Sequence, residues 1–272
     1  MSVEHYIKTA KELGFNMIRV HCKLESERFY YHCDTMGMLV WQDMVNGGAS
    51  YSLLKLCYLP TIFPYPFAKV NDKEKRVWRM TGRGRARSRR IWFEEMNETI
   101  HRLYNHPSIV CWVLFNEGWG QFDSSLMEER AKKLDPTRVV DAASGWFDQG
   151  AGDFMSVHNY FRPLKVVQSE RAFVISEFGG LAYREKDHVF SDKIYGYGLI
   201  KDKFALNRSF KDKMDRIKSL VPEGLSASVY TQLTDIEEEI NGLMTYDRRI
   251  TKIRNKGESH EKTEDPEGNQ IL

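Results

Sequence analysis

The chain has 272 residues, of which 42% are hydrophobic and 29% charged, enough for one large core. Its net charge is +2, so no global field points to nucleic acid or an anionic membrane as a partner. No apolar run is long enough to span a bilayer, and the start, MSVEHYIKTAKELG, lacks the apolar core of a signal peptide. We therefore expect a cytoplasmic location by default, or a periplasmic or secreted one if the true N-terminus lies further upstream.

The first part of the chain predicts strands and helices in alternation. Apolar residues at helical spacing over residues 3–13 predict a helix that ends at Gly14. The segments FNMIRVH and MLVWQDM are typical of short strands, and ESERFYYHCDTM between them is typical of a helix that ends at Gly37. A further amphipathic helix follows Arg87 and ends before Pro107.

The rest of the chain continues this alternation. Residues 109–115, IVCWVLF, are apolar throughout, which indicates a strand covered on both faces. A helix over 124–134, three strands (RVVDAAS, FMSVHNY, AFVISEF), a helix around Phe210 and a last strand, SASVYTQL, follow. Repeated strand–helix units predict a parallel sheet, and this many units favour an α/β (β/α)8 TIM barrel. Only seven strands are found, whereas a complete barrel has eight.

Two connections, 45–85 and 178–207, are long for this fold, and both follow strand C-termini, where barrel enzymes build their sites. We expect the barrel to occupy residues 1–250 and a polar tail to occupy 251–272. The four cysteines show no metal-type spacing. Three of them lie in apolar segments and are expected to be buried free thiols: Cys22, Cys33 and Cys111.

Polar side chains gather at the predicted strand C-termini, as expected of an active site in this architecture. They are Arg19, His21, Asp43, Asn116, Glu117, His158, Tyr160 and Glu177. The two glutamates each end an apolar strand and precede glycine, which lets the backbone turn away. A pair of carboxyl groups across a barrel mouth is the equipment of glycoside hydrolysis. The alternative for either glutamate is a structural carboxylate that pairs with Arg19 or caps a helix.

Other candidates carry their own alternatives. His21 and His158, taken singly, are as typical of hydrogen-bonded core histidines as of ligands. No set of histidine and acidic residues has convincing metal spacing, so we predict neither a catalytic metal nor a cofactor. Trp119, Trp146 and Trp41 are candidates for stacking on sugar faces, or else belong to the core.

The strongest charge run is RMTGRGRARSRR, residues 79–90, with six arginines. Such a run can bind RNA or another phosphate-rich partner. It lacks interleaved aromatic residues for base stacking, and the overall charge is small. We therefore interpret it as a solvated loop and predict no nucleic-acid partner.

Three motifs, NHPSIVCWVLFNEGWG, ISEFGG and YTQLTDIEEEINGLMTYDRR, resemble the catalytic barrel of glycoside hydrolase family 2, with the likeness running from about Tyr6 to Thr251. That family includes β-galactosidases, β-glucuronidases and β-mannosidases. The resemblance implies a retaining β-glycosidase, β-galactosidase-like, acting on oligosaccharides or glycosides by double displacement. Glu177 matches the family's nucleophile and Glu117 its acid/base, and Asn116 would bind the hydroxyl next to the anomeric centre.

The resemblance also places KELGFNMIRVH at the second barrel strand and the helix before it, so the first strand is expected to be absent. It further implies a β-sandwich and an immunoglobulin-like domain ahead of the barrel. A missing strand would leave an open edge between NMIRVH and SASVYTQL, through which the chain could self-associate. The alternative function is a truncated, catalytically inactive carbohydrate-binding barrel remnant.

Overall fold

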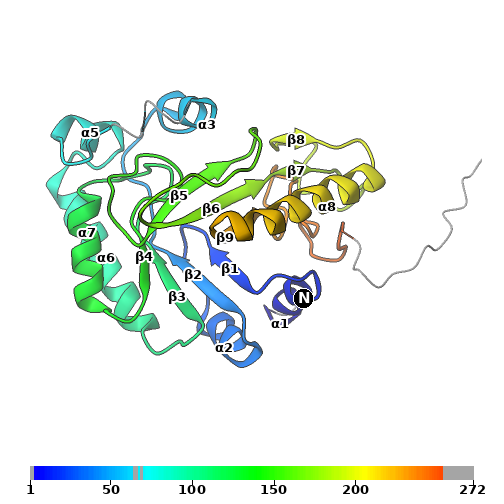
Figure 1. The fold of residues 1–272 in the computed structure, drawn as a ribbon, viewed down its shortest axis with the longest axis horizontal. Helices are drawn as coiled ribbons and strands as arrows, with labels where there is room; N and C mark the ends of the chain where they lie inside the picture. The colour runs from blue at the N-terminus through cyan, green and yellow to red at the C-terminus, as the bar shows by residue number, and fades with distance from the viewer. Residues whose placement is uncertain (1–2, 64–66, 68–69, 254–272) are drawn as a thin grey trace, which may run out of the picture.

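The computed structural model describes residues 3–63, 67 and 70–253. Its central strands are parallel and form two neighbouring sheets (Figure 1). The first sheet runs in the order β1 (Met17–Val20), β2 (Leu39–Asp43), β3 (Ile109–Val113) and β4 (Val139–Asp141). The second runs in the order β5 (Phe154–Asn159), β6 (Ala172–Gly179) and β9 (Leu225–Thr231). The predicted α/β TIM-barrel class is confirmed, and the described residues contribute the seven expected strands.

Helices cover the outside of the strands, each with one apolar face turned inward. They are α1 (Val3–Glu12), α2 (Glu27–Met36), α6 (Ala86–Leu103), α7 (Ser124–Leu134) and α8 (Lys203–Leu220), the last continued by the short 3₁₀ helix η2 (Val221–Glu223). Helix α2 ends where the sequence predicts, because Gly37 adopts φ 65° and donates its N–H to the carbonyl of Cys33. Each of these five α-helices was predicted from the sequence, whereas η2 was not.

The two long connections hold secondary structure of their own. The first contains a π-helix η1 (Leu54–Tyr58), α3 (Leu59–Ile62) and α5 (Lys75–Met80). The second contains a parallel pair of short strands, β7 (Leu181–Ala182) and β8 (Gly198–Leu199). Both connections leave the C-terminal ends of barrel strands and stand over that face of the sheet (Figure 1).

The barrel interior is filled by side chains from opposite strands. Trp41 on β2 stacks on Phe154 of β5 with ring centroids 5.2 Å apart and planes 11° from parallel. Cys111, Val113 and Val174 complete the buried cluster around Trp41. Trp41 is 4% exposed, so the structure corrects its interpretation as a sugar-stacking candidate: it is barrel core.

Two ladders expected of a closed barrel are not formed between the described strands. Strands β4 and β5 are neighbours without a hydrogen-bonded ladder, and so are β1 and β9. Between β3 and β4 the pairing is extended by an isolated bridge that joins Asn116 to Ser144. The predicted open edge between NMIRVH and SASVYTQL corresponds to the seam between β1 and β9.

The first residues of the expected C-terminal tail are packed against the barrel. Lys252 and Ile253 are buried, and residues 254–272 lie outside the described part of the chain. All four cysteines are free; Cys33 and Cys111 are buried as expected, whereas Cys22 is partly exposed. Among the described residues, no helix combines the length and apolarity needed to cross a membrane.

Two arginines of the basic run, residues 79–90, make contacts within the protein. Arg83 is buried and donates to the carbonyl and hydroxyl of Ser88. The guanidinium of Arg89 lies 4.1 Å over the ring of Trp78 and donates to two carbonyls of the same loop. These two arginines support the start of α6, which favours a structural role for them over a phosphate-binding one.

Candidate active site

Arg19 lies at the centre of the polar cluster, near the end of β1. Its guanidinium forms a bidentate pair with Asp43 at the end of β2, with N···O distances of 2.8 and 2.9 Å. It also donates to Oδ1 of Asn116 at 2.8 Å and to Oε1 of Glu177 at 3.2 Å. Burial opposes ionisation of Asp43, but Arg19 and His21 together outweigh it and hold the pKa of that carboxyl below its ordinary value. One buried cation thus fixes three side chains from three other strand ends.

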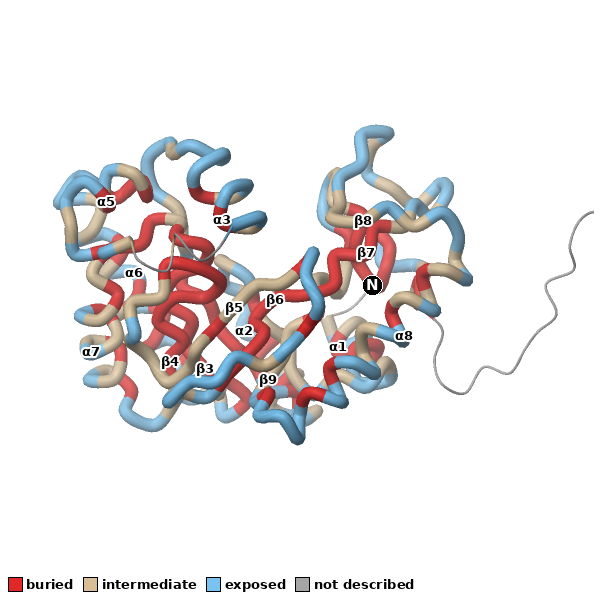
Figure 2. The backbone as a smooth tube through the Cα atoms, turned by 45° about the horizontal axis from the view of Figure 1, so that its top comes forward, coloured by how far each residue is buried: buried red, intermediate tan, exposed pale blue. Residues whose placement is uncertain are grey.

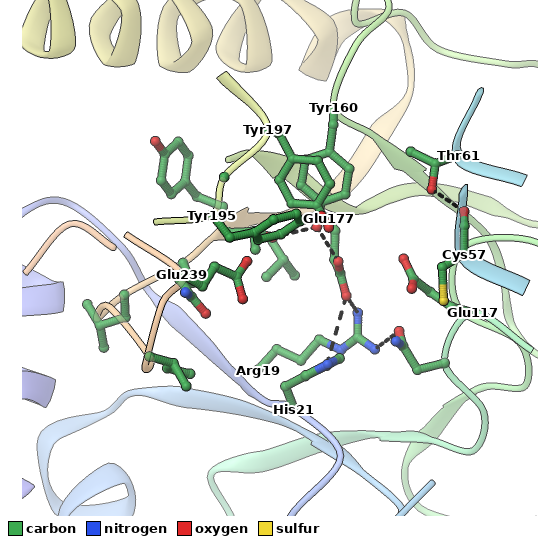
Figure 3. A pocket seen from close by; sticks show the side chains of 18 of the residues that line it. Arg19, His21, Cys57, Thr61, Glu117, Tyr160, Glu177, Tyr195, Tyr197 and Glu239 are labelled. Carbon is green, nitrogen blue, oxygen red and sulfur yellow. Dashed lines mark hydrogen bonds and ion pairs between the residues drawn. The ribbon is translucent and has the colours of Figure 1, made fainter. Parts of the chain in front are cut away.

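Glu177 extends from β6 and is 8% exposed. Its second oxygen accepts a hydrogen bond from the hydroxyl of Tyr160, which follows β5. The ring of Tyr160 is stacked on Tyr197 with centroids 3.8 Å apart (Figure 3). A Cβ on Gly180 would stand 2.6 Å from the Tyr197 ring, so glycine at this position allows the aromatic pair to close over Glu177. Glu177 is therefore held from two sides by an arginine and a phenol.

Glu117 follows β3 in a backbone conformation that is unusual for its residue type. Its φ is 51°, and its N–H donates to the carbonyl of Ser144 at 2.9 Å. The next residue, Gly118, also has positive φ, and a Cβ there would meet the Phe147 ring at 2.5 Å. Burial raises the pKa of the Glu117 carboxyl to about 7, against the opposing effect of His21 and Arg19. Strained backbone of this kind is concentrated at functional sites.

His158 connects the two glutamates. Its Nδ1 lies 2.9 Å from Oε1 of Glu117 and 3.5 Å from Oε2 of Glu177, and its Nε2 lies 3.1 Å from the hydroxyl of Ser144. Burial lowers the pKa of this imidazole to about 4, so it is neutral at neutral pH. One oxygen of each glutamate and one nitrogen of His158 all lie within 4.8 Å of one another. The two carboxyl groups are therefore close neighbours on either side of a neutral ring.

Two sets of side chains in this region have the spacing needed to hold a metal ion. They are Glu117 with His158 and Glu177, and His21 with Cys22 and Asp43. In each set one carboxylate is already paired with Arg19: Glu177 in the first and Asp43 in the second. The absence of a catalytic metal remains a prediction.

A cavity of about 930 Å³ opens over the carboxyl groups. Of the predicted residues it exposes Arg19, His21, Asn116, Glu117, Trp119, Tyr160 and Glu177. The ring of His21 meets Trp119 edge-on at 6.0 Å. Asp43 and His158 lie behind this surface and act on it through Arg19 and the glutamates. The cavity continues toward the seam, where Phe15, Met17, Val229 and Leu233 line it.

Trp146 is not on the cavity surface, which corrects the prediction that it stacks on sugar. It is 4% exposed and packs with Leu56 and Phe147. Its indole N–H donates to the carbonyl of Leu56 at 3.0 Å. Trp146 therefore supports the segment of η1 from behind.

Several residues that line the cavity were not predicted from the sequence. Tyr195 and Tyr197 come from the connection after β6, and Gln232 and Glu239 come from the loops after β9. Burial, with the nearby Glu177 and Glu117 adding to it, raises the pKa of Glu239. The aromatic run IYGYG in a long connection was the available signal for the tyrosines, since such connections carry barrel active sites. Glu239 stands among several acidic residues, and its spacing does not set it apart.

Comparisons with known proteins agree with this architecture. The profile of the family described as "Glycosyl hydrolases family 2, TIM barrel domain" matches residues 1–169. A mannosylglycoprotein endo-beta-mannosidase from Lilium longiflorum is 23% identical over 278 residues, covering 90% of this chain and 24% of that protein. A putative beta-glucuronidase from Formosa agariphila is 27% identical over 139 residues, covering 51% of this chain and 11% of that protein.

Solved structures are similar in fold. A GH2 beta-galacturonidase from Eisenbergiella tayi, bound to galacturonate, superposes with a TM-score of 0.63 at 20% identity, covering 92% of this chain and 45% of that one. A beta-D-glucuronidase from Dictyoglomus thermophilum gives a TM-score of 0.60 at 17% identity, covering 90% and 44%. The chain thus spans less than half of these relatives. Because the family profile covers more than half of its residues, the chain belongs to glycosyl hydrolase family 2, as part of the TIM barrel domain.

Proposed function

We propose that this barrel is the catalytic part of a retaining β-glycosidase that releases terminal β-linked sugars from oligosaccharides or glycosides. The observation that carries the proposal is the pair of buried carboxyl groups in unlike surroundings, with oxygens within 4.8 Å of each other. Retaining enzymes hold their carboxyl groups about 5–5.5 Å apart, whereas inverting enzymes need about 6.5–9.5 Å to admit a water. The short separation supports double displacement.

Glu177 is the proposed nucleophile. Arg19 and Tyr160 both donate to its carboxylate, which fixes its orientation. In the first step a Glu177 oxygen attacks the anomeric carbon, and the bond from that carbon to the glycosidic oxygen breaks. The product is a glycosyl ester on Glu177 and a free alcohol, whose proton must come from an acid.

Glu117 is the proposed acid/base. Its pKa of about 7 keeps a large share of the carboxyl protonated near neutral pH, so it can give that proton to the departing oxygen. In the second step the Glu117 carboxylate takes a proton from the water that attacks the anomeric carbon. The ester bond to Glu177 breaks, and both glutamates return to their starting states.

Asn116 is proposed to bind the hydroxyl next to the anomeric centre. Its Oδ1 is occupied by Arg19, which leaves Nδ2 as the donor. Among the described residues none accepts a hydrogen bond from this buried Nδ2, although Asn116 lines the cavity. A sugar hydroxyl would satisfy it, and a contact that strengthens in the transition state accelerates the reaction.

The proposal is tested by trapping the glycosyl-enzyme. The protein is incubated with a panel of 2-deoxy-2-fluoro β-glycosides that carry good leaving groups. The galactoside is tested first, followed by the glucuronide, the galacturonide and the mannoside. We expect one sugar to add its mass to the peptide that contains Glu177, and Glu177→Ala to remove both labelling and turnover. Glu94→Ala, on the exposed face of α6, is the matched control. Binding of a sugar from the panel without any labelling would contradict the proposal and support the alternative, a non-catalytic carbohydrate-binding barrel.

The acid/base role has its own test in the pH dependence. Glu117 must be protonated in the first step, so kcat/KM for a poor leaving group should fall as pH rises through about 7. Glu117→Ala should remove this alkaline limb and slow alkyl glycosides by a factor of about 10²–10⁴, while nitrophenyl glycosides lose little in the first step. Equal losses on both substrates would contradict the assignment.

A further inference from the structure

The segment of residues 53–63, which holds η1 and α3, is apolar on its solvent side. Leu53, Leu54, Tyr58, Leu59, Ile62 and Phe63 are each between 36% and 60% exposed. Figure 2 shows exposed stretches of the chain around α3 on the outside of the molecule. Soluble proteins rarely leave so many large apolar side chains together in water unless they bind something. This apolar surface is therefore a candidate binding surface.

The segment is fixed in place by its neighbours. Leu56 is fully buried beneath it against Trp146 and Phe147, and the Trp146 indole donates to the Leu56 carbonyl at 3.0 Å. At its other end the guanidinium of Arg162, after β5, donates to the carbonyl of Ile62. The exposed apolar side chains are thus held on a supported backbone.

The segment has a face toward the cavity and a face away from it. Leu53, Tyr58 and Ile62 line the cavity, as do Cys57 and Thr61 between them. Phe161 also lines the cavity, is 59% exposed and contacts Tyr197 edge-on at 5.8 Å. The remaining large side chains of the segment do not line the cavity: Leu54, Leu59 and Phe63.

The cavity-facing side lies next to Glu117. Figure 3 shows Cys57 and Thr61 beside Glu117, with Tyr195 and Glu239 on the other side of Glu177. Burial, partly opposed by Trp119 and assisted by the Glu117 charge, raises the pKa of the Cys57 thiol, in keeping with this proximity. An acid that protonates the departing oxygen must contact the leaving group. The part of the cavity beside Glu117 is therefore where the aglycone would bind.

We propose that Leu53, Tyr58, Ile62 and Phe161 form a binding wall for an apolar aglycone, an alkyl or aryl group rather than a second sugar. The wall offers aliphatic and aromatic surface with one phenol, which suits a hydrocarbon chain or ring and provides few partners for sugar hydroxyls. The assignment of this side to the leaving group rests on the proposed function.

The test compares hexyl with methyl β-glycosides of the same sugar. Binding is measured by calorimetry on the Glu177→Gln protein, which prevents turnover, with hexyl glycosides below their micelle-forming concentration. A fully buried methylene contributes about 0.8 kcal/mol, close to fourfold in affinity. With five added methylenes partly covered, we expect the hexyl glycoside to bind at least about tenfold more tightly. Equal affinities for the hexyl and methyl glycosides would contradict the proposed aglycone-binding wall.

Two matched double variants show which side chains produce the preference for the hexyl glycoside. Leu53→Ser with Ile62→Ser, both on the cavity face, should reduce the hexyl preference to less than about threefold without weakening methyl glycoside binding. Leu54→Ser with Phe63→Ser, on the outer face, should leave the preference unchanged. If the outer pair removes it equally, the segment is a general apolar surface, and the proposal fails.

The outcome is separable from that of the proposed function. Labelling of Glu177 without any preference for the hexyl glycoside would support the glycosidase proposal and contradict the proposed aglycone-binding wall. A hexyl preference that depends on Leu53 and Ile62, without labelling of Glu177, would keep an apolar ligand site on a non-catalytic barrel. Circular dichroism of each double variant checks that it is folded.

Discussion

At the level of single residues, a short chain of polar contacts runs from Ser144 through His158 to Glu117. Because the imidazole is neutral, one ring nitrogen donates and the other accepts. The Ser144 hydroxyl, 3.1 Å from Nε2, can donate to that nitrogen, which leaves Nδ1 to carry the proton and donate to Glu117 at 2.9 Å. A donor at this place favours the Glu117 carboxylate and so limits the rise in its pKa.

Replacing Ser144 by alanine should therefore move the alkaline limb of kcat/KM upward. Without the hydroxyl, the ring can accept from protonated Glu117 instead, and one lost hydrogen bond of about 1.4 kcal/mol corresponds to about one pH unit. The measurement is the pH profile with an alkyl glycoside. Ser156→Ala, which removes a buried hydroxyl bonded to Ser176 in the barrel interior, should leave the limb in place. An unmoved limb in Ser144→Ala would contradict the tautomer assignment.

At the level of elements, the sequence was informative where a periodic pattern decides the structure. Arg19 and Glu177 lie in short, largely apolar strands, and Glu117 follows another. Glycines follow both glutamates, and the parallel order of the strands brings the three side chains together. The placement of Tyr197 and Trp146 could not be predicted, because each depends on contacts far along the chain. Tyr197 is fixed by Tyr160, and Trp146 by a backbone carbonyl in η1.

The loops after β9 depend on one buried ion pair. Lys252 is fully buried, with Nζ 2.7 Å from Oδ1 of Asp235 and within 3.0 Å of the carbonyls of Tyr183 and Ile240. Lys252→Met would leave Asp235 as an unpaired buried acid, and such losses reduce the free energy of unfolding by about 3–5 kcal/mol. Urea denaturation measures this change. Lys218→Met, an exposed lysine of α8, should change it by less than about 0.5 kcal/mol.

At the level of the whole molecule, the described strands leave a seam between β1 and β9. No ladder joins these two strands, and apolar residues such as Met17 and Val229 line the cavity between them. Backbone groups along such a seam lack the protection that neighbours give to β2, β3 and β6. The seam is thus a weak place between the two sheets.

Amide hydrogen exchange should reveal this weakness. Amides of β1 and β9 that face the seam are expected to exchange at least about tenfold faster than those of β3 and β6, measured by mass spectrometry of peptic peptides. Because exposed strand edges pair with other chains, self-association should rise with protein concentration in sedimentation runs. Uniform protection across the strands, in a protein that stays monomeric, would show that the seam is closed in solution.

The two tethers of the η1–α3 segment have a consequence for how such a protein can diverge. Trp146 and Arg162 both hold main-chain carbonyls, those of Leu56 and Ile62, and not side chains. Any residue supplies the same carbonyl, so the side chains at positions 53, 58 and 62 are free to change without loss of anchorage. Under the proposed function, changes at these three positions would alter the group bound beside Glu117 without disturbing the proposed carboxyl pair, and an engineer can randomise the same three codons for the same reason.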